Sequence, residues 1–439
     1  MTTETQNPIE PCLAAHEKFA DTADGPGWLS DLRRTGITHF TELGFPTLKQ
    51  EEWIFTNVRP IQEHSFLPAT KPTSSIPAVD DLFFSELSGS RLVFVDGHLS
   101  HALSKFADVP EGAIVTNLAS ALETHPELVE KHLARYAKTD ESGYSALNTA
   151  FIQDGAFIYL PKGKVIDEPI QLLYVSTDGD SNTATLRNLV VAEPTSSCKV
   201  IESYQSAGEH AFFTNTVTEI RVDESANVEH CKFQDQNEES FHIATIQAQL
   251  AKACNFTSHS ISTGSRIARN NINLVMNGEG IECTLNGLYI VGGKQVVDHH
   301  TLADHAMPHC NSHEHYHGVL GDRSRGVFNG KIFVREDAQK TDAKQSSRAI
   351  VLTDGATVNA KPQLEIFADD VKCTHGATVG QLNSEAVFYC RSRGIDKASA
   401  RRLLTHAFAG EIIERISIEP VRERLEGLLW DRLEELIEQ

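Results

Sequence analysis

The middle of the chain, from about residue 146 to residue 388, consists of short apolar runs separated by brief breaks rich in Gly, Asp, Asn and Ser. Apolar and polar residues alternate cleanly in the stretches 219–223, 244–250 and 364–369. Alternation with a period of two is typical of strands with one buried face, and no stretch of this region has a convincing helical period. Many short strands without intervening helices leave a β-sandwich pair, a barrel or a β-solenoid as the architecture.

A solenoid fits this region best. Its strands are numerous, short and flanked by small residues, and no Greek-key connection is obvious in the sequence. In a solenoid each coil contacts only its neighbours, so the core can extend coil by coil. No strict short repeat marks the coils, which limits what the pattern alone can establish. We therefore predict a mainly β protein in which residues 146–390 form a parallel β-helix core.

Helical patterns flank the β region on its N-terminal side. Residues 10–57 place their apolar positions mostly at helical spacings, and residues 60–77 form a connector rich in Pro, Ser and Thr. Residues 91–97 predict a short strand that ends in a turn, and residues 111–136 have a mostly helical pattern. Residues 1–145 are thus predicted to form a mostly helical region with a connector.

Residues 391–439 predict a C-terminal region of two helices. Asp396 can cap the first helix, and Pro420 begins the second. The apolar residues of the two helices recur three and four positions apart. They include Leu403, Leu404, Phe408, Ile412, Leu425 and Leu429. Such a stripe either covers the protein's own core or docks on a partner, and both interpretations stay open at this point.

The composition limits the classes of function. The chain has 439 residues, of which 40% are hydrophobic and 23% charged, as in ordinary globular proteins. Its net charge of −21 argues against a nucleic-acid-binding surface, which needs a basic footprint, and against docking on anionic lipid. The first residues lack the features of a signal peptide, and no apolar run approaches the ~20 residues that cross a bilayer. We expect a soluble cytoplasmic protein without a nucleic-acid partner or membrane insertion.

The motifs of common enzymes are absent from the sequence. GxSxG, Walker A and GxGxxG strings do not occur. The eight cysteines include no CxxC pair, so neither a zinc ribbon nor a disulfide framework is expected. Only three tryptophans are available as aromatic platforms for a sugar chain. A non-enzymatic role is favoured, and a β-helix carbohydrate-active enzyme is the alternative from a different class.

The segment 361–379 contains the most informative pair of residues. Alternation places Cys373 and His375 on one face of a predicted strand, together with Ala377 and Val379, with α-carbons of the pair roughly 6.6 Å apart. A thiol and an imidazole at that spacing can meet one metal ion or one cluster, and both suit iron–sulfur chemistry. The competing interpretation is a small buried thiol beside a hydrogen-bonded histidine, because free cysteine usually packs as a small hydrophobe.

The histidine-rich segment 299–317 is a weaker metal candidate. Its candidate ligands are His305, His309, Cys310, His313, His315 and His317. Alternation puts the last three histidines on one strand face, which is typical of a metal site or of a solvated or interface face. The string HEHYH matches the zinc-protease pattern, but in a strand its end histidines stand roughly 13 Å apart, too far to share an ion. An iron-binding homodimer that uses this segment is a further alternative function.

Several ordered motifs resemble the SufB/SufD family of iron–sulfur cluster assembly proteins. They are GVFNGKI (326–332), AQKTDAKQ (338–345), KPQLEIFADDVKCTHGATVGQL (361–382) and FYCRSRGI (388–395). The likeness is dense from about Val297 to the C-terminus and looser upstream. SufB-like chains carry a cysteine and a glutamate where this chain has Ser347 and Gly376. The sequence is therefore most similar to the SufD branch.

The resemblance implies a right-handed parallel β-helix and a scaffold subunit without catalytic activity of its own. It implies a complex with a SufB-like paralogue and a SufC-like ABC ATPase, in which the apolar residues of the C-terminal helices dock SufC. His375 and Cys373 match residues that the family places at the contact between the two paralogues. There they hold iron or a cluster transiently, so no tightly bound cofactor is expected. Whether the chain forms a homodimer when alone stays open.

Overall fold

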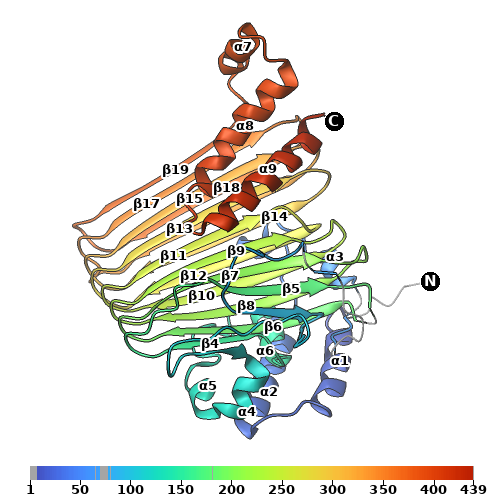
Figure 1. Ribbon diagram of the computed structural model, residues 1–439, viewed down its shortest axis with the longest axis vertical. Coiled ribbons are helices and arrows are strands. Elements are labelled where there is room, and N and C mark those ends of the chain that lie inside the picture. Colours follow the sequence, from blue (N-terminus) through green and yellow to red (C-terminus); the bar gives the residue numbers. More distant parts are fainter. Residues whose placement is uncertain (1–6, 65, 70–77, 80, 180, 439) are drawn as a thin grey trace.

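The computed structural model describes residues 7–64, 66–69, 78–79, 81–179 and 181–438. In this part of the chain the strands form two long sheets that lie face to face (Figure 1). The ten-stranded sheet contains, in chain order, β1 (Arg91–Val95), β2 (His98–Leu99), β5 (Ile170–Ser176), β7 (Ser197–Ser206), β9 (Asn227–Asp235), β11 (Asn255–Ser262), β13 (Glu282–Val291), β15 (Asn311–Leu320), β17 (Asp342–Val351) and β19 (Lys372–Gly380). The nine-stranded sheet contains β3 (Ile114–Asn117), β4 (Ala156–Leu160), β6 (Thr183–Ala192), β8 (Phe213–Val222), β10 (Phe241–Leu250), β12 (Ile267–Met276), β14 (Val296–His305), β16 (Arg325–Val334) and β18 (Thr357–Ile366).

The chain alternates between the two sheets, coil by coil. From β4 onward each even-numbered strand belongs to the nine-stranded sheet and each odd-numbered strand to the ten-stranded sheet. Neighbouring strands pair in parallel and residue for residue, as Leu186, Thr216, Ala244 and Asn270 do along four successive coils. A side chain that points inward in one coil therefore lies directly over an inward side chain of the next. The prediction of a parallel β-helix with flanking helices is confirmed.

A residue with left-handed backbone geometry recurs at the turn from the nine-stranded sheet back to the ten-stranded sheet. The angle φ is positive at Thr195, Ser225, Ala253, His309 and Lys340. Each of these residues donates its backbone N–H to a carbonyl in the turn of the following coil. A non-glycine residue adopts this conformation at a cost of roughly 1–2 kcal/mol. The stacked hydrogen bonds offset that cost and keep the coils in register.

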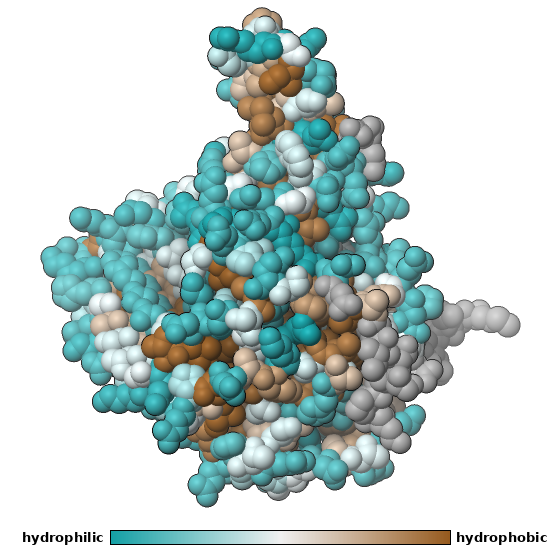
Figure 2. Space-filling view, viewed as in Figure 1, coloured by the Kyte–Doolittle hydropathy of each residue, from teal (hydrophilic) through white to brown (hydrophobic). Residues whose placement is uncertain are grey.

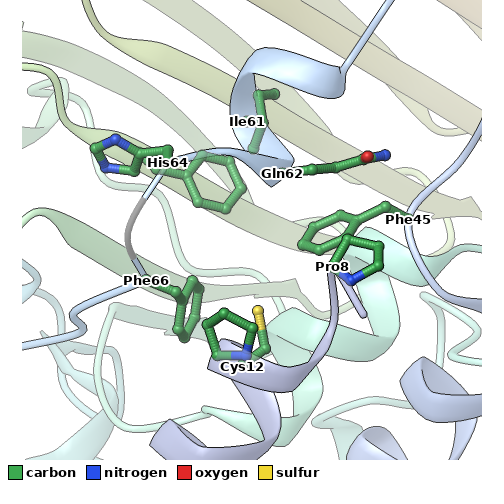
Figure 3. Close-up of a pocket in the computed structure, with 9 residues that line it drawn as sticks. Pro8, Cys12, Phe45, Ile61, Gln62, His64 and Phe66 are labelled. Atoms are coloured by element: carbon green, nitrogen blue, oxygen red, sulfur yellow. The ribbon is translucent and has the colours of Figure 1, made fainter. Parts of the chain in front are cut away.

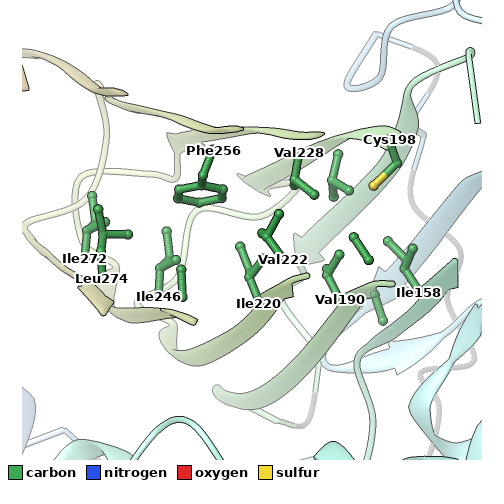
Figure 4. Packing of buried hydrophobic residues seen from close by; sticks show 14 of the residues in the cluster. Ile158, Val190, Cys198, Ile220, Val222, Val228, Ile246, Phe256, Ile272 and Leu274 are labelled. Atoms are coloured by element: carbon green, nitrogen blue, oxygen red, sulfur yellow. The ribbon is translucent and has the colours of Figure 1, made fainter. Parts of the chain in front are cut away.

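The interior between the sheets is filled by the apolar positions of the alternating strands. In Figure 4, Ile220, Ile246 and Ile272 of the nine-stranded sheet face Val228 and Phe256 of the ten-stranded sheet. All five side chains are buried. Removing apolar surface from water contributes about 25 cal/mol per Å². Because the interior is continuous from coil to coil, this burial holds the solenoid together along its length.

The N-terminal region closes the first coils of the solenoid. Its helical segments are α1 (Glu10–Ala20), α2 (Gly27–Leu43), the 3-10 turn η1 (Glu51–Trp53), α3 (Arg59–Gln62), α4 (Leu118–Thr124), α5 (Pro126–His132) and α6 (Gly143–Ala150). α2 packs so closely on α6 that a Cβ added at Gly36 would lie 2.5 Å from the backbone nitrogen of Ala150. The predicted connector 60–77 falls partly outside the described residues, at 65 and 70–77. Of the strands in the same region, β1 and β2 belong to the ten-stranded sheet and β3 belongs to the nine-stranded sheet.

The segment 51–58 crosses the outer face of the nine-stranded sheet from β12 to the last strand, β18. Trp53 covers Arg269 of β12, with 3.7 Å between the guanidinium carbon and the ring centroid. Glu51 forms an ion pair with Lys361 of β18. A segment near the N-terminus thereby contacts strands that come much later in the sequence.

The C-terminal helices are α7 (Ser384–Ser392), α8 (Lys397–Ile413) and α9 (Glu419–Glu438). Asp396 caps α8 as predicted, because its carboxylate accepts a hydrogen bond from the Ser399 N–H at 3.0 Å. α8 and α9 bury their apolar residues on the outer face of the ten-stranded sheet, against residues such as Phe233 and Leu288. α7 projects beyond the last coil (Figure 1). Among the described helices, none has both the length and the apolar character that crossing a bilayer requires.

The replacement Gly287→Ala tests the packing between coils. Gly287 is an inward position of β13, and a Cβ added there would lie 2.1 Å from Cδ1 of Tyr316 in the next coil. We expect the variant to lose about 1–3 kcal/mol of unfolding free energy, because overpacking forces side chains and backbone to shift. Gly376→Ala on β19 is the matched control, since a Cβ there meets no atom within 4 Å. Urea denaturation measures both, and equal midpoints for Gly287→Ala and the wild type would contradict the prediction.

Candidate functional site at the open end of the solenoid

The two ends of the solenoid differ. The N-terminal helices cover the first coils, whereas the last two strands, β18 and β19, pair on one side only, with β16 and β17. The apolar side chains of Ile366, Phe367 and Val379 at this end are exposed. An unpaired edge strand presents free N–H and C=O groups with which another chain can pair. The last coil therefore forms an open end, made of the edges of β18 and β19.

Cys373 and His375 lie on β19 at this open end. The thiol and the imidazole share one face of the strand, as predicted. Their register partners on β17 are Ala343 and Gln345, which point inward, so this is the inward face. Cys373 is half-buried and packs against an apolar cluster that includes Ile332. His375 is exposed and makes no side-chain hydrogen bond to any described residue. The imidazole is therefore available to a ligand from outside.

The half-buried thiol of Cys373 has an environment that favours its protonated form. Burial raises the pKa of the thiol, and the nearby Asp342 carboxylate raises it further, although a hydrogen bond with the backbone of Ala343 acts in the opposite direction. Thiolate is the form that binds metals, so a metal ion would have to displace the thiol proton. Of the two residues, His375 is the one ready to bind an incoming ion.

A buried carboxylate lies two coils below His375. Glu314 on β15 is in register with Gln345 on β17, which is in register with His375 on β19. Thr301 on β14 donates a hydrogen bond across the interior to Oε2 of Glu314 at 2.6 Å. Burial raises the pKa of Glu314 to about 7, although the hydrogen bonds from Thr301 and Gln345 lower it. We call Glu314, Gln345 and His375 the inward column.

Neither Glu314 nor Gln345 is among the candidate ligands predicted from the sequence. In the string HEHYH, Glu314 stands between His313 and His315, so alternation turns it to the opposite face of the strand. The available signal was a carboxylate at an inward position of an alternating strand. A buried carboxylate is costly unless it is paired, so such a position indicates a function or a special structural need.

The first three candidates of the histidine-rich segment have different surroundings. His305 points into the interior, where its Nε2 lies 2.8 Å from Oγ of Ser312. His309 is an exposed turn residue with a φ of 60°. Cys310 is buried and its thiol donates to the carbonyl of Gly278 at 3.1 Å. No group of three or more His, Cys, Asp or Glu side chains in the described part of the chain is arranged to hold a metal ion.

The other three histidines lie on the outer face of β15, close to the C-terminal helices. His317 is buried under α8, donates from Nδ1 to the backbone carbonyl of Phe408 at 2.8 Å and stacks on its ring. Burial is also the main cause that lowers the pKa of His315, to about 4. Because His313, His315 and His317 belong to a strand and Glu314 points to its other face, the HEHYH string lacks the geometry of a zinc protease.

The candidate docking residues of the C-terminal helices fall into two groups. Phe408, Ile412, Leu425 and Leu429 are buried against the solenoid, so a partner could reach them only by displacing α8 and α9. Leu403 is exposed and Leu404 is half-buried, near the end of α8 that follows α7.

The structure adds exposed aromatic residues that the sequence analysis did not single out. Phe388 and Tyr389 on α7 are 71% and 60% exposed. Figure 2 shows hydrophobic surface on the arm that α7 and the start of α8 form above the body of the protein. Exposed apolar side chains that gather on a projecting element mark a surface for protein contact. We call Phe388, Tyr389 and Leu403 the arm surface.

A small cavity lies among the N-terminal elements and is distinct from the open end (Figure 3). Phe45, Ile61, Phe66 and Cys12 contribute to its wall, and His64 lies at its side. Burial raises the pKa of the Cys12 thiol to about 12, so the thiol is unreactive. This apolar wall indicates a packing feature of the N-terminal region.

Comparisons with known proteins find related proteins along almost the whole chain. A model of the SufBD core domain of SUF-system FeS cluster assembly matches residues 174–408, and a model of the SufBD protein N-terminal region matches residues 17–172. An iron–sulfur cluster assembly SufBD family protein of Synechocystis is 34% identical over 395 residues, 87% of this chain and 86% of the relative. The iron–sulfur cluster assembly protein SufD of Escherichia coli is 31% identical over 410 residues, 92% of this chain and 91% of the relative. SufD of Bacillus subtilis is 28% identical over 432 residues, 94% of this chain and 96% of the relative.

The variant Glu314→Gln tests the buried carboxylate through the pH dependence of stability. A folded-state pKa of about 7, against an ordinary value of 4.5, means that the folded protein holds a proton that the unfolded chain has released. The carboxylate thus destabilises the fold increasingly as the pH rises from about 4.5 to about 7, by about 3 kcal/mol when fully developed. We expect Glu314→Gln in metal-free buffer to be more stable than the wild type at pH 8 and equally stable near pH 4.5.

The control for this measurement is Glu282→Gln, at an exposed carboxylate on β13. It should follow the wild-type pH profile, as measured by chemical denaturation at a series of pH values. A constant difference between Glu314→Gln and the wild type across this pH range would show that the carboxylate is not titrating as described.

Proposed function

This chain belongs to the SufBD family of iron–sulfur cluster assembly proteins, and we propose that it is the SufD-like subunit of a complex with a SufB-like paralogue and a SufC-like ABC ATPase. In this proposal the chain is a cytoplasmic scaffold with no catalytic activity of its own. It holds no permanent cofactor and contributes ligands for iron or a cluster that is shared with the paralogue. ATP hydrolysis belongs to the ATPase partner.

The open end of the solenoid is the observation that carries this proposal. It combines two unpaired edge strands with an exposed imidazole and a half-buried thiol on the inward face. Edge strands recruit further strands through main-chain hydrogen bonds. A paralogue with the same coil geometry can continue both sheets, and the contact would then surround His375 and Cys373. When the chain is alone, we expect the same edges to pair with a second copy.

The residues at two positions near the proposed ligands favour the SufD branch over the SufB branch. Ser347 is a buried inward residue of β17, and Gly376 follows His375 on β19. A SufB-like chain is expected to carry a cysteine and a glutamate at these positions. In this chain neither residue supplies a metal ligand of that kind, so the paralogue must bring the principal thiolate and carboxylate. The ligands proposed here are therefore complementary to those of the partner.

The arm surface supports the proposed contact with the ATPase. Phe388, Tyr389 and Leu403 expose apolar side chains on an element that projects away from the solenoid. Movement of the ATPase would be transmitted through α8, which is packed on the outer face of the ten-stranded sheet. The arm surface thus links a nucleotide-driven partner to the coil that ends at His375.

The replacement His375→Ala tests the ligand role. In the intact complex, we expect cluster formation to fall by about tenfold or more, because the exposed imidazole is the residue ready to bind an incoming ion. Cluster yield is followed by visible absorption during anaerobic reconstitution. Thr374→Ala is the matched control, since Thr374 is exposed on the same strand but points to the opposite face.

Assembly of the complex is measured in the same samples by size-exclusion chromatography. A His375→Ala complex that assembles normally and forms clusters at the wild-type yield would remove His375 from the mechanism. A loss that Thr374→Ala shares would assign the effect to the strand edge instead.

Leu403→Ala tests the arm surface. We expect binding of the SufC-like ATPase to weaken by about fivefold, which corresponds to the roughly 1 kcal/mol lost when an apolar anchor is truncated. Leu48→Ala is the control, because Leu48 is also an exposed leucine but lies in the N-terminal region. Affinity is measured by biolayer interferometry with the purified ATPase. Equal affinities for the two variants would place the docking surface elsewhere.

A further inference from the structure

In the coils just before the open end, a group of polar side chains spans the interior between the two sheets. Glu314 is 0% exposed and Gln345 is 3% exposed. Oε2 of Glu314 accepts hydrogen bonds from Oγ1 of Thr301 at 2.6 Å and from Nε2 of Gln345 at 3.1 Å. Because Thr301 belongs to the opposite sheet, the carboxylate reaches across the interior, as the carboxylate of Glu202 does toward Thr218 in an earlier coil.

Three oxygen atoms of this group have no partner among the described residues. They are Oε1 of Glu314, Oε1 of Gln345 and the hydroxyl of Tyr316. Glu314 and Gln345 are directly in register, and Tyr316 is the next inward residue of the Glu314 strand. No ion pair to Glu314 occurs in the described part of the chain, where its side-chain partners are Thr301 and Gln345. A buried carboxylate without a cation and with an unpaired oxygen is unfavourable, because it has lost its hydration without gaining a full set of partners.

A glycine on the opposite sheet leaves room for these polar side chains. Any larger residue at that position would collide with them. Gly330 on β16 lies across the interior from Gln345. A Cβ added at Gly330 would lie 2.3 Å from Nε2 of Gln345 and 2.7 Å from Cζ of Phe328. The φ of Gly330 is not in the left-handed region, so glycine is needed here for space alone. The amide of Gln345 is thus accommodated by the opposite sheet.

The inward column connects this group to the outside. Gln345 is directly below His375 in the register of β17 and β19. Strands in a sheet lie about 4.8 Å apart, so the α-carbons of Glu314 and His375 are separated by roughly 10 Å. His375 is exposed at the open end. A ligand that binds its imidazole is therefore only two strand spacings from the unpaired carboxylate oxygen.

We propose that the inward column is a binding site for a single divalent cation, Fe²⁺, held by the free oxygens of Glu314 and Gln345 and reached through His375. This inference rests on the proposed function and makes it more specific, because the chain then binds the metal ion before a cluster exists. Carboxylate and amide oxygens are ligands for hard divalent cations, and imidazole is a ligand for iron. The cation supplies the positive charge that the buried carboxylate lacks. The hydroxyl of Tyr316 is the third oxygen within the group.

Binding of Mn²⁺ and Fe²⁺ to the chain expressed alone tests this site. The protein is stripped with a chelator, and Mn²⁺ binding is followed by the loss of the electron paramagnetic resonance signal of the free ion. Fe²⁺ binding is measured anaerobically by competition with a coloured chelator. We expect one equivalent to bind to the wild type, and Glu314→Gln to lower the affinity by about tenfold or more. Glu282→Gln, at an exposed carboxylate, should bind like the wild type.

Two further variants make the outcome decisive. His375→Ala should slow uptake of Mn²⁺ in stopped-flow measurements, because the imidazole is the entry point. The double variant His313→Ala/His315→Ala changes the outer face of the same strand and should leave binding unchanged. Thermal unfolding confirms that each variant is folded, and Glu314→Gln should be no less stable than the wild type at pH 8.

The inference is overturned if the wild type binds no Mn²⁺, or if Glu314→Gln binds it as tightly as the wild type. It is also overturned if the outer histidine variant loses binding while Glu314→Gln keeps it, which would assign the cation to the histidine face. These failures are distinct from a failure of the proposed function, because that function is judged by cluster yield of the His375→Ala complex.

Discussion

The unshifted register between coils is the constraint on which the rest of this structure depends. Each strand pairs residue for residue with the strand of the next coil, so an inward position in one coil stays inward in every coil. Residues that are one coil apart in the sequence therefore line up in columns through the interior. A slip of one residue in any pair would turn the following side chains to the outer face. The alignment of Glu314, Gln345 and His375 exists only because no such slip occurs.

The flanking regions cover the outer faces of both sheets but leave the last coil open. The segment 51–58 follows the nine-stranded sheet as far as β18, and α8 and α9 cover the ten-stranded sheet. α7 comes shortly after β19 yet projects away from it (Figure 1). Proteins usually protect an edge strand with charges, bulges or a covering element. Here the edge keeps exposed apolar residues such as Phe367 and Val379, which fits an end that another chain covers.

The sequence was sufficient to predict the local features of this fold. Alternation over two residues identifies strands and the residues that share a face, so it placed Cys373 and His375 together and grouped His313, His315 and His317 on one face. Helix patterns and the Asp396 cap were equally local. The burial of Phe408 and Ile412 was not decided by the sequence, because an apolar stripe packs equally well on its own sheet or on a partner. Which coil is last, and what each inward residue meets across the interior, depend on contacts between segments far apart in the chain.

The position of Glu314 shows that stability alone does not determine the interior of this solenoid. One coil deeper in the same column, the inward residue is Leu285, which is buried among apolar neighbours. Replacing a buried charged group by an apolar residue of similar volume is often neutral or stabilising. A leucine at position 314 would therefore suit the fold better than a carboxylate whose pKa burial raises to about 7. The column runs from His230 and Ser258 through Leu285 to Glu314, Gln345 and the exposed His375, so its last three positions are polar where a ligand from outside could enter.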